Sequence, residues 1–220
     1  VIAISMNRLY EFTYKLENGA LYMDFIDPHD IYDKIIVIDA GHGSRMSGAT
    51  KNGIQEKDIN LDIVLQLKAL FDAYDGNIGV YYTRTDDSNP TLQQRAELAN
   101  KAGADLFISV HNNSSGTGNF TSVNGTQVLY SESDDRELGS KKLAQICLDN
   151  VTAATGSNDF GLLKADDIYI VRSSEAPVAL IEVGFMTNRD ELAKLADPEY
   201  QKTAAQGIFN AVLEAVKEGY

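Results

Sequence analysis

The chain has 220 residues and a formal net charge of −13, from 19 basic and 32 acidic side chains. This length fits one α/β domain, or one domain with a small appendage, and the acidic balance argues against nucleic acid as a partner, because phosphate binding requires clustered Lys and Arg. No apolar run approaches the roughly 20 residues of a membrane helix, and a single cysteine excludes an internal disulfide.

Residues 1–33 differ in pattern from the rest of the chain. Apolar and polar residues alternate over 8–16 and 20–25, on either side of Glu17-Asn18-Gly19, and an Asn-Gly pair between two such runs predicts a β-hairpin. Because an isolated hairpin is marginally stable, we interpret it as the remnant of an upstream module or as edge strands docked on the sheet of residues 34–220. The chain opens on Val1 rather than Met, so we expect it to be part of a longer protein.

The first strand of residues 34–220 ends in a histidine. Ile35-Ile36-Val37-Ile38 precedes Asp39-Ala40-Gly41-His42-Gly43, which predicts a buried strand over 34–39 and a sharp turn at the glycines. His42 is then presented at the end of a sheet strand, where sites of open α/β folds are usual. A lone loop histidine would need no function, so this assignment depends on the residues that follow.

A Gly- and Ser-rich loop over 40–55 leads into a helix that begins at Glu56. Apolar residues recur there at helical spacing, at Ile59, Ile63, Leu67, Leu70 and Phe71. Glu56 lies in the first turn, where the helix dipole alone would favour a carboxylate. Beside two histidines at strand ends, metal ligation is the alternative that we favour.

Two further strand ends carry charged or polar residues. A strand over 79–83 ends at Arg84, and a helix over 91–102 carries Arg95; both arginines are either positioning charges beside the site or ordinary salt-bridge partners at the surface. A strand over 105–110 then delivers His111, followed by Asn112 and Asn113. The Asn-, Ser- and Gly-rich stretch after them predicts a loop that walls a groove.

The last third of the chain supplies the remaining strands and helices. We expect strands over 127–130, 168–171 and 178–181, an irregular segment over 154–166, and helices over 134–151 and from 198 to the end. Cys147 lies among apolar residues of the first of these helices and is expected to fill core space. The final strand delivers Glu182. Strands that alternate with helices predict an α/β fold with a mainly parallel sheet covered on both faces.

Five sequence blocks resemble the zinc-dependent N-acetylmuramoyl-L-alanine amidases of the Amidase_3 family. They read DAGHG, QEKDINL, TR, LFISVHNN and ALIEVGFMTN, and they occur in the family's order from about Lys34 to the C-terminus. The resemblance implies a three-layer fold with roughly six strands in the sheet and a catalytic domain over 34–220. One departure is Ser44-Arg45-Met46-Ser47-Gly48-Ala49, where the family usually has further Gly and Pro-Gly, so the adjoining groove wall is expected to differ.

The same resemblance implies a catalytic zinc site. His42, Glu56 and His111 would be the three protein ligands, a set typical of catalytic zinc with an open fourth position. A zinc-bound water would then be the nucleophile, and Glu182 would act as general base and acid with a pKa raised by burial. Glu182 as a fourth ligand or a salt-bridge partner is the open alternative.

Further roles are implied for residues around these four. Asn113 would bind substrate or orient a ligand, Arg84 and Arg95 would contact or position substrate, and Arg172 would bind a substrate carboxylate. Some family members carry an inserted helix that blocks the site. The interval from His111 to Glu182 is short for such a helix, so we predict a domain without that inhibition.

The expected substrate is peptidoglycan, cut at the amide between N-acetylmuramic acid and L-alanine, outside the cell in the wall or periplasm. We expect a monomer, and an upstream cell-wall-binding module in the longer chain, since an acidic domain is not attracted to anionic wall polymers. A zinc peptidase acting on the stem peptide and a non-enzymatic wall-binding scaffold stay open as alternatives. A nucleotide-binding domain is excluded because no Gly-rich phosphate loop is present.

Overall fold

The computed structural model describes residues 3–116 and 118–220. Its centre is a six-stranded sheet in the order β6-β3-β7-β10-β8-β9, in which all neighbours are parallel except β10 and β8. The strands are β3 (Lys34–Ala40), β6 (Ile78–Tyr82), β7 (Leu106–Asn113), β8 (Thr126–Tyr130), β9 (Asp159–Lys164) and β10 (Val178–Phe185). The mainly parallel, six-stranded sheet expected from the sequence is confirmed.

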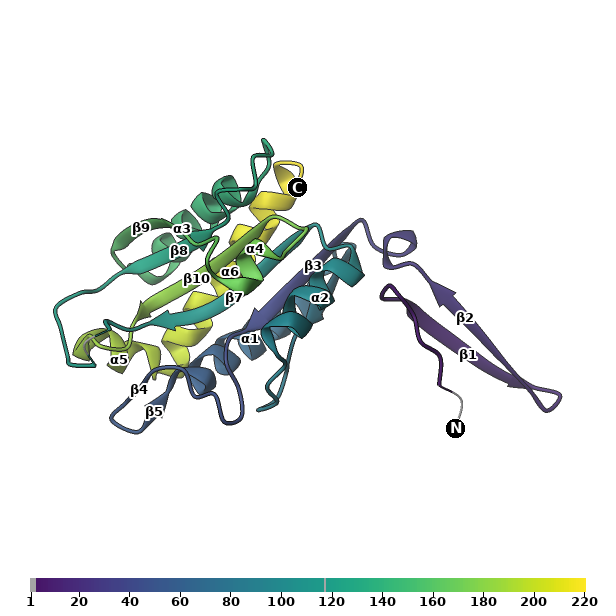
Figure 1. Ribbon diagram of the computed structural model, residues 1–220, viewed down its shortest axis with the longest axis horizontal. Coiled ribbons are helices and arrows are strands. Elements are labelled where there is room, and N and C mark those ends of the chain that lie inside the picture. Colours follow the sequence, from purple (N-terminus) through teal and green to yellow (C-terminus); the bar gives the residue numbers. More distant parts are fainter. Residues whose placement is uncertain (1–2, 117) are drawn as a thin grey trace.

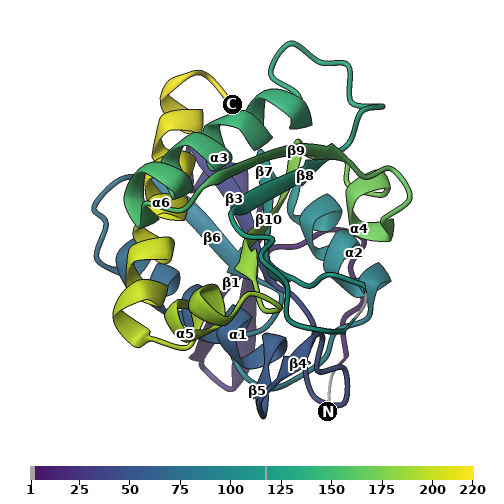
Figure 2. The same cartoon turned by 90° about the vertical axis from the view of Figure 1, so that its left-hand side faces the viewer.

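Helices cover both faces of this sheet (Figure 2). One face carries α1 (Glu56–Asp72), α3 (Ser140–Thr155) and α6 (Pro198–Lys217), and the other carries α2 (Leu92–Ala102) and the short α4 (Tyr169–Arg172). The side chains of β3 alternate between the two cores: Ile36 and Ile38 pack toward α1, whereas Ile35 and Val37 pack toward α2. Because both faces of β3 are buried, its sequence is apolar at nearly every position.

Local signals account for the helix ends. Thr91 and Gln94 form a capping box at the start of α2, and Gly103 ends that helix with φ of 61°. α3 begins at Ser140, six residues later than predicted, because the Asp134 carboxylate accepts hydrogen bonds from the Ser140 backbone N–H and hydroxyl. Cys147 lies fully buried in α3, as expected.

One predicted strand was wrong. Residues 168–171 form the helical turn of α4, and the sixth strand is instead β9, in a segment that we expected to be irregular. A four-residue apolar run fits a buried helical turn as well as a strand. β9 lies at the sheet edge and is mostly exposed, so it lacks the apolar pattern that would have identified it.

The N-terminal hairpin, β1 (Glu11–Glu17) and β2 (Ala20–Ile26), forms a two-stranded sheet of its own and projects from the domain (Figure 1). Docking on the central sheet was therefore wrong. The strand register places six apolar side chains on one face: Phe12, Tyr14, Leu16, Leu21, Met23 and Phe25. Five of them are exposed, and the hairpin's link to the domain includes a 2.6 Å hydrogen bond from Tyr81 Oη to Glu11.

None of the helices within residues 3–116 and 118–220 is long and apolar enough to cross a membrane.

The carboxyl ends of β3, β7 and β10 meet at one edge of the sheet, close to α5 (Arg189–Leu195) and the small hairpin of β4 (Thr50–Lys51) and β5 (Ile54–Gln55) (Figure 1). Glu182 on β10 is the direct register partner of His111 on β7. This edge therefore brings together side chains that are far apart in the sequence.

Candidate metal and catalytic site

His42, Glu56 and His111 converge where β3 and β7 end and α1 begins: His42 follows β3, His111 lies near the end of β7, and Glu56 is the first residue of α1. Glu56 Oε1 lies 3.0 Å from His111 Nδ1 and 3.2 Å from His42 Nε2. The nearest ligand atoms of the three residues all lie within 4.8 Å of one another. The three side chains predicted as metal ligands are thus brought together by the fold.

The Glu56 carboxylate is buried and surrounded by donors. Burial alone would raise its pKa, but hydrogen bonds with His111 and His42 hold the pKa well below its usual range. Its oxygens also accept the backbone N–H groups of Ala49 and Asn112, at 2.9 and 3.2 Å. Conversely, burial would lower the pKa of His111, and the hydrogen bond with Glu56 raises it. Glu56 is therefore held as an anion that can neutralise part of a cation's charge.

The distances from Glu56 Oε1 to the ring nitrogens of His42 and His111 fit a zinc site. Ligand bonds of about 2.0–2.1 Å in a tetrahedron place neighbouring ligand atoms about 3.3 Å apart, close to the 3.0 and 3.2 Å separations. Two glycines leave the space that this arrangement needs. A Cβ on Gly41 would lie 2.2 Å from the His111 ring, and a Cβ on Gly48 would lie 2.4 Å from Glu56 Oε2.

Glu182 enters the site from β10 and differs from Glu56 in its environment. Its Oε2 is buried without a hydrogen-bond partner among the described residues. Burial raises the pKa of Glu182 to about 7, and the charge of Glu56 adds to the shift, whereas His111 opposes it. A carboxyl group with a pKa near 7 and an unpartnered oxygen can both accept and return a proton.

Two buried arginines hold the backbone that carries His42. Arg84 donates from Nε to Ala40 O (2.8 Å) and from Nη2 to Gly41 O (2.9 Å), while Arg95 donates from Nη2 to His42 O (2.6 Å). His42 has φ of +62°, a conformation that is uncommon for a residue with a side chain. These contacts support a positioning role for both arginines; Arg84 is buried and also donates to the carbonyls of Asp86 and Lys57, at 2.9 and 2.8 Å.

Arg95 is also one half of a buried ion pair with Asp39, at 2.5 Å. Asp39 accepts further hydrogen bonds from Thr83 and Ser109, both at 2.6 Å. Burial would raise the pKa of Asp39, but Arg95 and these hydroxyls keep it lowered. The carboxylate thus fixes Arg95, which in turn holds the turn at His42.

The sequence analysis missed two asparagines behind the ligands. Asn60 donates to Gly41 O at 3.1 Å, and Asn112 donates to Asn60 Oδ1 at 2.7 Å. Both are buried, so they link α1 to the ends of β3 and β7. The sequence did contain an indication for Asn60. It lies four residues after Glu56 on the buried face of α1, where a polar amide is unfavourable unless it forms hydrogen bonds.

Asn113 and Arg172 differ in their positions. Asn113 lies beside the cluster, where it donates to Gln127 Oε1 at 3.2 Å. Arg172 donates to Asp167 O at 2.5 Å and lies over the Tyr169 ring. It lines a separate hollow with Ser131 and Arg136, so the fold does not bring it to the other site residues.

Two hollows adjoin the cluster and share His42 and His111. One, of about 460 Å³, also contains Glu56 and Glu182 and is otherwise lined largely by residues 112–116 and Gly118, at and after the end of β7. The other, of about 340 Å³, has an apolar wall built from Met46, Pro90, Leu92 and Ile170. The site therefore lies in the middle of a groove with two chemically different arms.

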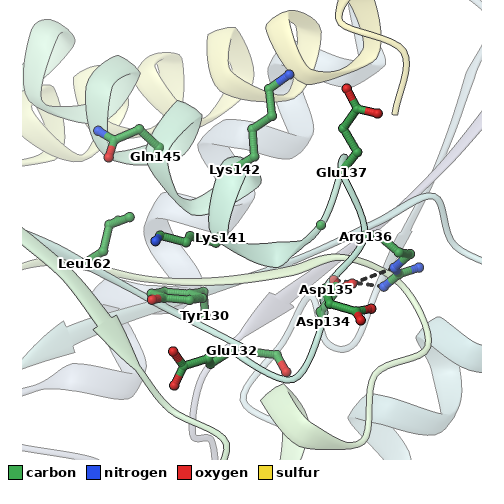
Figure 3. Close-up of a pocket in the computed structure, with 12 residues that line it drawn as sticks. Tyr130, Glu132, Asp134, Asp135, Arg136, Glu137, Lys141, Lys142, Gln145 and Leu162 are labelled. Carbon is green, nitrogen blue, oxygen red and sulfur yellow. Dashed lines mark hydrogen bonds and ion pairs between the residues drawn. The ribbon is translucent and has the colours of Figure 1, made fainter.

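A larger hollow of about 570 Å³ lies at the start of α3 (Figure 3). One of its lining residues is Tyr130, the last residue of β8. Gln127, the register partner of Glu182, lies near the opposite end of the same strand. Some of its charged side chains form ion pairs, as Arg136 with Asp134 at 2.6 Å and Lys142 with Glu218 at 2.7 Å. The described residues that line it include no histidine or cysteine, so it lacks the donor set of the His42, Glu56 and His111 cluster.

Comparison with known proteins agrees with this geometry. The Amidase_3 family profile, described as N-acetylmuramoyl-L-alanine amidase, matches residues 36–214. The catalytic domain of CwlV, the N-acetylmuramoyl-L-alanine amidase of Bacillus (Paenibacillus) polymyxa var. colistinus, superposes with a TM-score of 0.76 at 34% identity, over 84% of this chain and 98% of that one. The N-acetylmuramoyl-L-alanine amidase of Clostridium difficile 630 gives 0.78 at 32%, over 85% and 98%.

Curated relatives include two proteins of Bacillus subtilis (strain 168). The uncharacterized protein YqiI is 36% identical over 83% of this chain and 84% of its own length. The N-acetylmuramoyl-L-alanine amidase LytC is 34% identical over 83% of this chain, which spans only 36% of LytC. With the family profile, these matches show that the chain belongs to the Amidase_3 family of N-acetylmuramoyl-L-alanine amidases, which are cell-wall hydrolases.

Proposed function

We propose that this chain hydrolyses the amide between N-acetylmuramic acid and L-alanine in peptidoglycan, with zinc held by His42, Glu56 and His111. The observation that carries the proposal is the unpartnered carboxyl oxygen of Glu182 beside a His₂Glu cluster of zinc-compatible spacing. When bound, Zn²⁺ supplies Lewis-acid polarisation of the carbonyl and lowers the pKa of water.

The chain's own residues then move the proton. Glu182 Oε2 accepts a proton from the attacking water and returns it to the nitrogen of the leaving L-alanine, so that the amine departs uncharged before it is protonated by solvent. A carboxyl pKa of about 7 suits both transfers near neutral pH. Arg84, Arg95 and Asp39 keep the His42 turn in place during the reaction, because a buried, fully bonded support limits its movement.

The setting of the reaction follows from the substrate. We propose that the chain acts outside the cell, at the wall or in the periplasm, with residues 34–220 as the catalytic domain and 1–33 as an extension of it or the remnant of an upstream module. α3 packs on α6 and the sheet, and no residue of α3 or α4 lines the hollow that contains Glu182. This supports the prediction of a domain that needs no partner to open its site.

The test is digestion of purified peptidoglycan by the zinc-loaded chain, with the released ends identified by mass spectrometry. The proposal predicts new L-alanine amino ends and glycan strands that keep an intact lactyl group. Glu182→Gln, prepared in the same way, is the matched control and should release neither. Released amino acids would instead favour a zinc peptidase, and zinc binding without any product would favour the non-enzymatic scaffold.

A further inference from the structure

Two cations share one aromatic ring at the outer wall of the site. The guanidinium of Arg189 lies 4.0 Å from the ring centre of Phe120, and the ammonium of Lys51 lies 5.5 Å from the same centre. Within the part of the chain that the structure describes, neither cation has a carboxylate within ion-pair distance. Two like charges held together in an acidic protein form a local attraction for an anion.

Lys51 is hydrogen-bonded to a residue that lines the hollow containing Glu182, and Phe120 lies close to that residue in the chain. Lys51 donates a hydrogen bond to Gly118 O, and Gly118 lines that hollow. Phe120 follows two residues later, which limits its backbone to about 7 Å from Gly118. The cation pair is therefore within reach of a ligand that extends out of the hollow.

Hydrogen bonds tie this wall to the end of β10. Thr121 N–H donates to Thr187 O at 2.8 Å, Ser115 N–H donates to Thr187 Oγ1 at 2.9 Å, and Met186 N–H donates to Asn113 O at 2.8 Å. Arg189 begins α5 two residues after Thr187. The loop with Phe120 and the segment with Arg189 thus form one wall continuous with the strand that carries Glu182.

We propose that Lys51 and Arg189, on the ring of Phe120, form a subsite for a carboxylate of the stem peptide beyond L-alanine. This inference rests on the proposed function. The second residue of the stem is a γ-linked glutamate whose α-carboxyl group is either free or amidated, and it lies one residue from the scissile bond.

The subsite makes the enzyme discriminate between two stem peptides. A free α-carboxylate forms ion pairs with both cations, whereas the neutral amide offers them only a carbonyl oxygen as an uncharged acceptor. Because Arg189 is exposed and Lys51 is half-buried, the gain in binding free energy is moderate. We expect a preference for the acid of about three- to tenfold in kcat/KM, expressed mainly in KM.

The experiment compares two muramoyl tripeptides that differ only in having isoglutamate or isoglutamine as the second residue. Kinetics are measured for the zinc-loaded wild type, for Lys51→Gln with Arg189→Gln, and for Lys194→Gln, which removes a cation from the same helix away from Phe120. The double variant should cut both substrates at the rate of the wild type on the amide, and Lys194→Gln should keep the preference. Binding of the free tripeptide products, measured by calorimetry, should show the same pattern.

The outcomes separate this inference from the proposed function. Equal use of both substrates by the wild type, or an unchanged preference in the double variant, would overturn the subsite and leave the amidase intact. Equal loss on both substrates in the double variant would assign Lys51 and Arg189 to the fold of the wall instead. Failure of the wild type to cut either substrate would count against the proposed function itself.

Discussion

At the scale of single residues, the site uses two glutamates in opposite ways. Glu56 is surrounded by donors that stabilise its charge, whereas Glu182 has a buried oxygen, Oε2, that accepts no hydrogen bond within the described chain. The same side chain is thus tuned as an anionic ligand in one place and as a proton carrier in the other. The difference comes from the hydrogen-bond donors and the burial around each carboxyl group, which the sequence alone does not display.

Burial of Glu182 should cost stability in a pH-dependent way. The pKa rises from 4.5 to about 7 on folding, so the native state binds the proton more tightly, and stability is lost as the pH rises through this interval. In metal-free protein, Glu182→Gln should therefore raise the free energy of unfolding by up to about 3 kcal/mol at pH 8 and by under about 1 kcal/mol at pH 5. Urea unfolding at both pH values measures this, and an equal effect at pH 5 and 8 would refute the assigned pKa.

Replacing either histidine of the metal cluster should have a different effect from replacing Glu182. His42→Ala and His111→Ala each remove one of three donors, so both variants should lose zinc and turnover while the sheet stays folded. Metal analysis after dialysis, with circular dichroism as the folding control, checks this. A variant that keeps its zinc would remove that histidine from the ligand set.

At the scale of elements, the turn between β3 and β4 depends on two arginines from other elements. Arg84 follows β6 and Arg95 lies on α2, and together they bind three consecutive carbonyls, of Ala40, Gly41 and His42. This arrangement holds His42 in its left-handed conformation, whose cost is of the order of 1–2 kcal/mol. The metal site is thus built partly from residues that never touch it.

Replacing Arg84 should weaken the metal site more than the fold. Arg84→Lys keeps the charge but cannot reach the carbonyls of Ala40 and Gly41 together. We expect the zinc Kd to rise roughly tenfold, as for other supports of metal ligands. Competition with a chelator measures this, and Arg136→Lys, which loosens a surface pair with Asp134, is the control. An unchanged Kd for Arg84→Lys would contradict the positioning role.

Most elements of the domain followed from the sequence, and the exceptions have physical reasons. The buried runs of β3, β7 and β10 and the periodic faces of α1 and α6 carry strong patterns because they bury apolar side chains on regular spacings. β9 lacked such a pattern because an edge strand needs none. The sequence blocks that resemble the Amidase_3 family pointed to His42, Glu56, His111 and Glu182. The roles of Asn60 and Asp39 could not be predicted in this way, because they depend on contacts between residues 19 and 70 positions apart in the chain.

At the scale of the whole molecule, residues 34–220 and the N-terminal hairpin are built differently. The domain has two continuous cores, one on each face of its sheet. In the hairpin, Phe12, Tyr14 and Leu16 are 58%, 71% and 73% exposed to solvent. An exposed apolar surface of this kind is typical of a site that binds a protein or a membrane. This contrast supports the proposed division near residue 33.

Truncation tests that division. A chain that begins at Asp27 loses the Tyr81–Glu11 hydrogen bond and the packing of Leu9, which together contribute about 2 kcal/mol. It should still unfold in one transition and keep the wild-type kcat on a soluble muramoyl peptide. Thermal unfolding and kinetics check this, and loss of cooperative unfolding would show that the hairpin belongs to the domain.

The most direct test of the assigned site is to measure zinc content and turnover on the same preparations of the wild type, Glu182→Gln and His111→Ala. We predict about one zinc per chain with turnover for the wild type, about one zinc without turnover for Glu182→Gln, and neither for His111→Ala. Loss of zinc in Glu182→Gln would make Glu182 a ligand. Full turnover of that variant would contradict its role as the base, and with it the proposed mechanism.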